Sequence, residues 1–99
     1  MASQGAKQKN FPVRWIPSAR NAYTQSITYI ASQNQQASTL VAQRVEKALL
    51  LISAQPEIGT PTRAGRRRYP VPRTGHILEY YFASNEVRIT RWARHSRGP

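Results

Sequence analysis

A stripe of apolar residues with helical spacing runs through the middle of the chain and restricts its fold more than any other feature. The members of the stripe recur at i, i+3, i+4 and i+7: Ala37, Leu40, Val41, Val45, Ala48, Leu49 and Ile52. This spacing places them along one side of an α-helix, which must bury that side against another part of the protein. Gln55 precedes Pro56, and a residue before proline disfavours the helical conformation, so we expect the helix to end there.

A second helical pattern precedes this one. Pro17 and Ser18 are typical of a helix start, and apolar residues follow at helical spacing, which predicts a helix over residues 17–32. The polar segment 32–36 is short enough to be a turn between two helices. The two helices are therefore predicted to form an antiparallel hairpin.

Strand-like segments flank the predicted hairpin. Residues 11–16 alternate in character, and Pro12 favours an edge strand or a first strand position. A loop rich in proline and glycine, residues 56–65, follows the hairpin. Beyond it, alternation and a tight turn at Ser84 and Asn85 predict three short strands, over residues 67–72, 76–83 and 86–93.

This order of elements predicts an α+β fold. The N-terminal strand and the antiparallel two-helix hairpin would pack on one face of a three- to four-stranded antiparallel sheet. We also expect the N-terminal strand, residues 11–16, to join that sheet. The length of 99 residues suits one small domain over residues 11–99, and the basic segment 1–10 is expected to be a disordered lead-in.

The composition excludes several classes of site. There is no cysteine, which rules out disulfides and thiolate metal sites and suits a reducing compartment, so we expect a cytoplasmic protein. The apolar run from Ala48 to Ala54 is too short to span a membrane, and the N-terminus lacks the apolar core of a secretory signal. No membrane association, metal or cofactor is expected.

The charge of the chain implies an anionic partner. Fifteen lysine and arginine residues face four acidic residues and give a formal net charge of +11. Twelve of the fifteen are arginine, the residue that grips carboxylates and phosphates with two parallel hydrogen bonds. Residues 61–99 alone carry nine arginines, so the partner, either a nucleic acid or an acidic protein, is expected to meet this part of the chain.

The candidate binding residues are arginines in and around the predicted strands: Arg66, Arg67, Arg68, Arg73, Arg91, Arg94 and Arg97. At the start of a strand, Arg66 and Arg68 would face one side of the sheet and Arg67 the other. In the last strand, simple alternation places Arg91 and Arg88 on opposite faces. These arginines are also consistent with a surface that is only solvated.

Catalytic groups are scarce. The four glutamates are scattered, and no metal-binding set, no nucleophilic triad and no glycine-rich phosphate loop is present. His95, within Arg-His-Ser-Arg, is the one candidate for a catalytic base, because a neutral imidazole among arginines could accept a proton from a 2′-hydroxyl. The pattern is more typical of a solvated histidine in the tail after the last strand.

Several local motifs occur in an order that resembles a known family. They are VRWIPSA from Val13, the pair Tyr29-Ile30, LISAQPEIGTP from Leu51, GRRRYPVPRTGHILEYYF from Gly65, and VRITRWARHSR from Val87. In this order the chain resembles the RelE/ParE superfamily of toxins of bacterial toxin–antitoxin modules. The resemblance covers most of the chain.

The resemblance favours the ParE-like branch. The RelE-like branch cleaves mRNA on the ribosome and uses a tyrosine after the last strand, whereas the last tyrosine here is Tyr81. The ParE-like branch shares the pattern from Gly65 to Val71 and an ending similar to Arg91, His95 and Arg97. The resemblance therefore implies a toxin that inhibits DNA gyrase by binding, without catalysis of its own.

The resemblance also implies a partner. Toxins of this kind are neutralised by a small acidic antitoxin, a segment of which folds on the toxin, and the two form a hetero-oligomer. Two alternatives stay open: a ribosome-dependent mRNA endoribonuclease with His95 as base, and a non-toxic module that binds nucleic acid.

Overall fold

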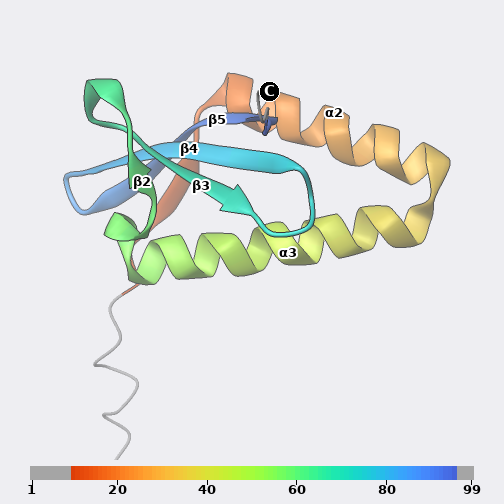
Figure 1. The fold of residues 1–99 in the computed structure, drawn as a ribbon, viewed down its shortest axis with the longest axis horizontal. Coiled ribbons are helices and arrows are strands. Elements are labelled where there is room, and N and C mark those ends of the chain that lie inside the picture. Colours follow the sequence, from red (N-terminus) through yellow and green to blue (C-terminus); the bar gives the residue numbers. More distant parts are fainter. Residues whose placement is uncertain (1–9, 96–99) are drawn as a thin grey trace, which may run out of the picture.

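The structure is a computed structural model that describes residues 10–95 (Figure 1). Residues 1–9 and 96–99 lie outside the described part, and with them most of the predicted lead-in and the candidate Arg97. The elements, with η for a short 3-10 helix, are β1 (Val13–Trp15), α2 (Pro17–Gln33), α3 (Gln35–Ala54), η1 (Pro56–Ile58), β2 (Thr60–Pro61), η2 (Arg63–Gly65), β3 (Arg67–Val71), β4 (His76–Ala83) and β5 (Glu86–Arg94).

The two helices form the predicted hairpin, with a tighter connection than expected. A single residue, Asn34, separates α2 from α3, where the sequence predicted a five-residue turn. The side chain of Asn34 accepts a hydrogen bond from the backbone N–H of Ala37 at 3.1 Å. This cap lets the glutamines after Asn34 form the first turn of α3. At the other end α3 stops before Gln55, as the proline at 56 predicted.

The sheet has five strands in the order β1-β5-β4-β3-β2. The α+β fold and the entry of the N-terminal strand into the sheet are confirmed, but the sheet is mixed, because β1 pairs with β5 in parallel. Hairpin turns force antiparallel pairing on β3, β4 and β5, whereas the helical hairpin that follows β1 imposes no such constraint. The sequence did not predict β2. It consists of two residues of the predicted loop, which pair with β3 at the edge of the sheet.

The helices cover one face of the sheet (Figure 1). We call this the helix-covered face and the other the open face. The core between the layers contains Ile52 of α3 and Leu78, Tyr80, Val87 and Ile89 of the sheet, all fully buried. The hairpin extends beyond the sheet (Figure 1). Leu40, a member of the predicted stripe in the first half of α3, is 46% exposed.

Aromatic contacts fix α2 to the helix-covered face. The ring of Tyr23 lies 5.2 Å from Trp15 of β1 and 5.0 Å from Trp92 of β5. Trp92 donates a hydrogen bond from Nε1 to Oγ of Ser26 at 3.0 Å. Burial raises the pKa of Tyr23, and the nearby Glu46 raises it further, so its hydroxyl stays protonated.

An irregularity in β5 decides which side chains reach the open face. Two successive residues of β4, Glu79 and Tyr80, pair with Arg91 and Ile89, so the residue between those two is left without a partner. An extra residue of this kind reverses the alternation of the side chains beyond it. Arg91 therefore lies on the same face as Arg88, and the prediction that these two arginines face opposite ways was wrong.

Among the described residues, no helix is both long enough and apolar enough to cross a membrane.

Candidate functional site

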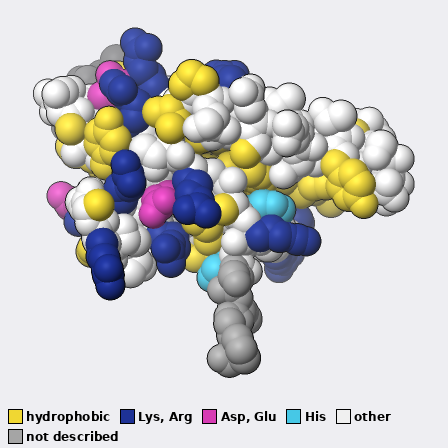
Figure 2. Space-filling model, turned by 90° about the horizontal axis from the view of Figure 1, so that it is seen from above, with side chains coloured by type: hydrophobic (Ala, Val, Ile, Leu, Met, Phe, Trp, Pro, Cys, Tyr) yellow, Lys and Arg dark blue, Asp and Glu magenta, His cyan; other side chains and the backbone are white. Residues whose placement is uncertain are grey.

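The open face carries charges on four adjacent strands. Register and alternation place four arginines and two glutamates on it: Arg14, Arg68, Arg88, Arg91, Glu79 and Glu86. The formal net charge of this group is +2. Figure 2 shows a similar mixture of charges: lysine and arginine side chains (dark blue) gather around a few acidic side chains (magenta) on the part of the molecule that contains the sheet.

One row of side chains across the strands of the open face alternates between positive and negative charge. Arg68 of β3 and Arg91 of β5 are both register partners of Glu79 in the strand between them. Both arginines are exposed, while Glu79 is half-buried. Within residues 10–95, neither arginine forms an ion pair shorter than 4.0 Å with Glu79. With respect to residues 10–95, the guanidinium groups of Arg68 and Arg91 are therefore available to an incoming anion.

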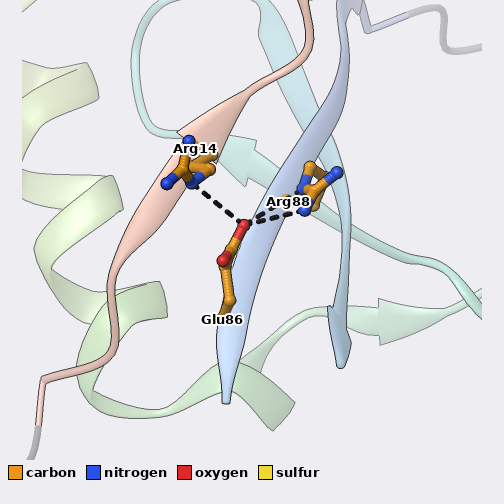
Figure 3. A network of polar contacts seen from close by, with 3 residues as sticks. All are labelled: Arg14, Glu86 and Arg88. Atoms are coloured by element: carbon orange, nitrogen blue, oxygen red, sulfur yellow. Dashed lines mark hydrogen bonds and ion pairs between the residues drawn. The ribbon is translucent and has the colours of Figure 1, made fainter. Parts of the chain in front are cut away.

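A second group on the open face is internally paired (Figure 3). Oε2 of Glu86 lies 3.3 Å from Nε of Arg14 and accepts hydrogen bonds from Nη2 and Nε of Arg88 at 2.9 and 3.2 Å. Arg14 and Arg88 are register partners on neighbouring strands, so without Glu86 their charges would repel. The carboxylate thus holds two cations side by side at the β1 edge of the face.

Arg67 lies on the other face and has a structural role. Its Nη1 donates hydrogen bonds to the carbonyl oxygens of Glu57 at 3.1 Å and Gly59 at 2.8 Å, which holds the chain after α3 against the sheet. The sequence placed Arg67 opposite Arg66 and Arg68, and the register agrees with that placement. A guanidinium used in this way has fewer donors left for a partner than the exposed Arg66 or Arg68.

Tyr80 completes the same internal contact. Its buried hydroxyl donates to the carbonyl of Pro56 at 2.7 Å and accepts from the N–H of Gly59 at 2.9 Å. Burial raises the pKa of Tyr80, which keeps the phenol in the donating form. A Cβ atom on Gly59 would lie 2.8 Å from the Tyr80 oxygen, so a larger residue there would force the Tyr80 ring or the loop to move.

Tyr80→Phe is expected to lower the free energy of unfolding by about 1–3 kcal/mol, because a buried N–H and a buried carbonyl lose their partner. Urea denaturation followed by circular dichroism measures the change. Tyr81→Phe is the matched control, since the Tyr81 hydroxyl has no hydrogen-bond partner among residues 10–95, and its effect should stay within about 0.5 kcal/mol. Equal losses in the two variants would contradict a specific role for the Tyr80 hydroxyl.

Two further candidates, Arg73 and Arg94, lie at the end of the sheet where β4 starts and β5 ends. Arg94 is the register partner of His76, and Arg73 lies in the turn before β4 with a positive φ of 58°. The carbonyl of Arg73 accepts a hydrogen bond from Nη1 of Arg44 at 3.4 Å. A groove of about 670 Å³ opens here between α2 and the sheet, and Arg94 is the only cation in its described lining.

The two described histidines have different surroundings. His76 stacks on Trp92 with ring centroids 4.4 Å apart, and its Nδ1 lies 3.0 Å from the carbonyl oxygen of Thr74. His95 is exposed, and its backbone N–H donates to the carbonyl of Gly75 at 2.8 Å. Over residues 10–95 neither ring contacts a carboxylate, and no three histidine, aspartate or glutamate side chains gather to hold a metal.

The structure therefore separates the sequence candidates. Arg68 and Arg91 lie together on the open face, and Arg66 is exposed just before β3. Arg73 and Arg94 lie near the groove, and Arg67 is engaged internally. The sequence analysis did not include Arg14 or the two glutamates of the open face. Alternation between Val13 and Trp15 could have shown that Arg14 points away from the core, but its position beside Arg88 depends on the parallel pairing of β1 with β5.

Comparison with known proteins gives two findings. A family model described as the ParE toxin of the type II toxin–antitoxin system parDE matches residues 13–99. Ten chains in solved structures also match. One of them, from a chromosomal ParDE toxin–antitoxin system of P. aeruginosa, superimposes with a TM-score of 0.75 at 14% sequence identity, covering 89% of this chain and 99% of that one. At this identity the structural match shows the fold alone. No curated protein matches the sequence.

Proposed function

The chain belongs to the family of ParE toxins of type II toxin–antitoxin systems, and on this basis we propose that it inhibits DNA gyrase by binding, without catalysis of its own. The observation that carries the proposal is the open face of the sheet. Arg68 and Arg91 are exposed there without an internal ion pair among residues 10–95, and no acid–base set lies beside them. Such a surface favours binding to an anionic partner over bond breaking.

The same surface supports an acidic antitoxin as the second partner. A disordered acidic segment that folds on the toxin could bring carboxylates to the exposed arginines, and charge complementarity would speed the encounter. We propose that toxin and antitoxin form a hetero-oligomer in the cytoplasm, where the bound antitoxin competes with gyrase for the basic surface.

The direct test of this function is DNA supercoiling by purified gyrase in the presence of the purified protein. Supercoiling should fall as the protein is added, and the cognate antitoxin should restore it. Unchanged supercoiling at concentrations well above those that stop growth would reject the proposal.

His95 distinguishes the proposal from an mRNA endoribonuclease. The exposed ring of His95 next to Arg94 is the observation that keeps the alternative open. Because binding alone needs no proton transfer, His95→Ala should change growth inhibition by less than about threefold. A general acid–base group would give a loss of roughly 100-fold or more. Growth inhibition is measured by induced expression of each variant, with His76→Ala as a second histidine variant and immunoblotting to equalise protein levels.

A further inference from the structure

The two acidic side chains of the open face, Glu79 and Glu86, lie directly beside its arginines, where a carboxylate would repel a bound phosphate. We propose that Glu79 and Glu86 make this face selective for an acidic polypeptide segment and against nucleic acid. The inference rests on the proposed function, since it specifies the kind of partner that the basic surface takes. It is tested by binding alone, so that its outcome does not depend on gyrase.

Glu79 lies between Arg68 and Arg91, which form no ion pair within residues 10–95. Arg68 and Arg91 are its register partners on the two neighbouring strands, so their Cα atoms lie two strand spacings apart, about 10 Å. A nucleic-acid backbone that contacts both guanidinium groups must cross the Glu79 carboxylate with a phosphate close by. Every linkage of that backbone is negative, and it has no cation with which to compensate the repulsion.

A polypeptide can satisfy the same row. Carboxylates of an acidic segment can meet Arg68 and Arg91, while a lysine, an arginine or a backbone N–H of that segment donates to Glu79. Glu79 has no ion-pair partner within 4.0 Å in the described part of the chain, so its carboxylate can accept such a donor. The row therefore matches an alternating pattern of charge, which acidic proteins can carry and polyphosphates cannot.

Glu86 acts on the other two cations of the face. One oxygen of its carboxylate engages both Arg14 and Arg88 (Figure 3), and its side chain is only 21% exposed. The side chains of the two arginines are 69% and 41% exposed, so they remain at the surface while paired. An anion that approaches them must compete with a carboxylate that is already in place. A polypeptide can offset this competition by donating an N–H to Glu86, whereas the backbone of DNA has no donor for it.

The four glutamates of the chain allow a comparison of two variants with equal charge, one changed on the open face and one changed elsewhere. The protein has four glutamates and no aspartate, and the two that do not lie on the open face are Glu46 of α3 and Glu57 of η1. The double variants Glu79→Gln/Glu86→Gln and Glu46→Gln/Glu57→Gln therefore raise the net charge of the whole chain equally. Glutamine keeps the size of the side chain, so both variants should fold, as circular dichroism and thermal unfolding would verify.

Two probes are compared by fluorescence anisotropy: a DNA duplex without any specific site, and a synthetic helical peptide that carries more glutamate than lysine. The wild-type protein should prefer the peptide. The open-face variant should bind DNA about tenfold more tightly than wild type near 0.1 M salt, and its salt dependence should steepen by about 0.9 for each phosphate gained. Peptide affinity should fall or stay unchanged, because Glu79 no longer accepts a donor.

Two outcomes would overturn the inference. If both double variants gain DNA affinity equally, only net charge matters and the two open-face glutamates have no special role. If the wild-type protein already prefers DNA to the peptide, the open face is a nucleic-acid site, as expected for a non-toxic module that binds nucleic acid. Should the double variant fail to fold, Glu79→Gln alone makes the same comparison with Glu57→Gln as its control.

Discussion

Replacement of Arg68 and Arg91 by glutamate should abolish growth inhibition while the protein stays folded. Both side chains are exposed on the open face and lack internal ion pairs among residues 10–95, so their loss costs the fold little. Loss of a charged group that a partner engages costs about 2–5 kcal/mol, which corresponds to about 30-fold or more in affinity, and reversed charges add repulsion. The concentration for half-maximal effect on gyrase should rise accordingly.

The matched control reverses two exposed cations on the helices, Arg20 of α2 and Lys47 of α3. This variant has the same net charge as the open-face variant and should retain most of its toxicity. Cell growth after induction and thermal unfolding of both proteins are measured side by side. Equal loss of toxicity in the two variants would assign the effect to net charge and would contradict a role for the open face.

Ile52→Asp should unfold the domain. Ile52 is fully buried at the end of the α3 stripe, and an unpaired carboxylate at such a site costs several kcal/mol. That cost approaches the whole stability of a small domain, which is about 5–15 kcal/mol. Circular dichroism should show the loss of cooperative thermal unfolding, and growth inhibition should disappear with the fold.

Leu50→Asp is the control on the same helix. Its side chain is 59% exposed, two residues from Ile52 on the other side of α3, and the free energy of unfolding should change by no more than about 0.5 kcal/mol. A folded Ile52→Asp protein, or an unfolded Leu50→Asp protein, would contradict the assignment of the buried face of α3.

Local chemistry in the sequence was sufficient to predict the helices. The apolar spacing through Val45, Ala48 and Ile52 predicted the buried side of α3, and Pro56 predicted its end. The N-cap of α3 at Asn34 was not predicted. Asparagine is a preferred N-cap residue, because its side chain can accept a hydrogen bond from a backbone N–H in the first turn of the helix, here that of Ala37. The prediction of a five-residue turn was wrong because Gln35 and Gln36 were assigned to it from their polarity.

Features that depend on contacts between distant residues could not be predicted in this way. The one-residue shift that brings Arg91 to the face of Arg88 arises in the pairing of β4 with β5, and strict alternation gave the opposite answer. The internal role of Arg67 depends on carbonyl groups of Glu57 and Gly59 that only the folded chain brings within reach. Residue type indicated a basic surface, but only the register shows which arginines share it.

Gyrase activity with three proteins tests the account most directly. Supercoiling by purified gyrase, scored also for cleaved DNA that remains trapped on the enzyme, is measured with wild type, with Arg68→Glu/Arg91→Glu and with Arg20→Glu/Lys47→Glu. Binding of gyrase by the open face predicts inhibition by the wild type and by the helix variant, and reversal by the cognate antitoxin. It also predicts no inhibition by the open-face variant at about 30 times the effective concentration. Full inhibition by the open-face variant, or none by the wild type, would contradict it.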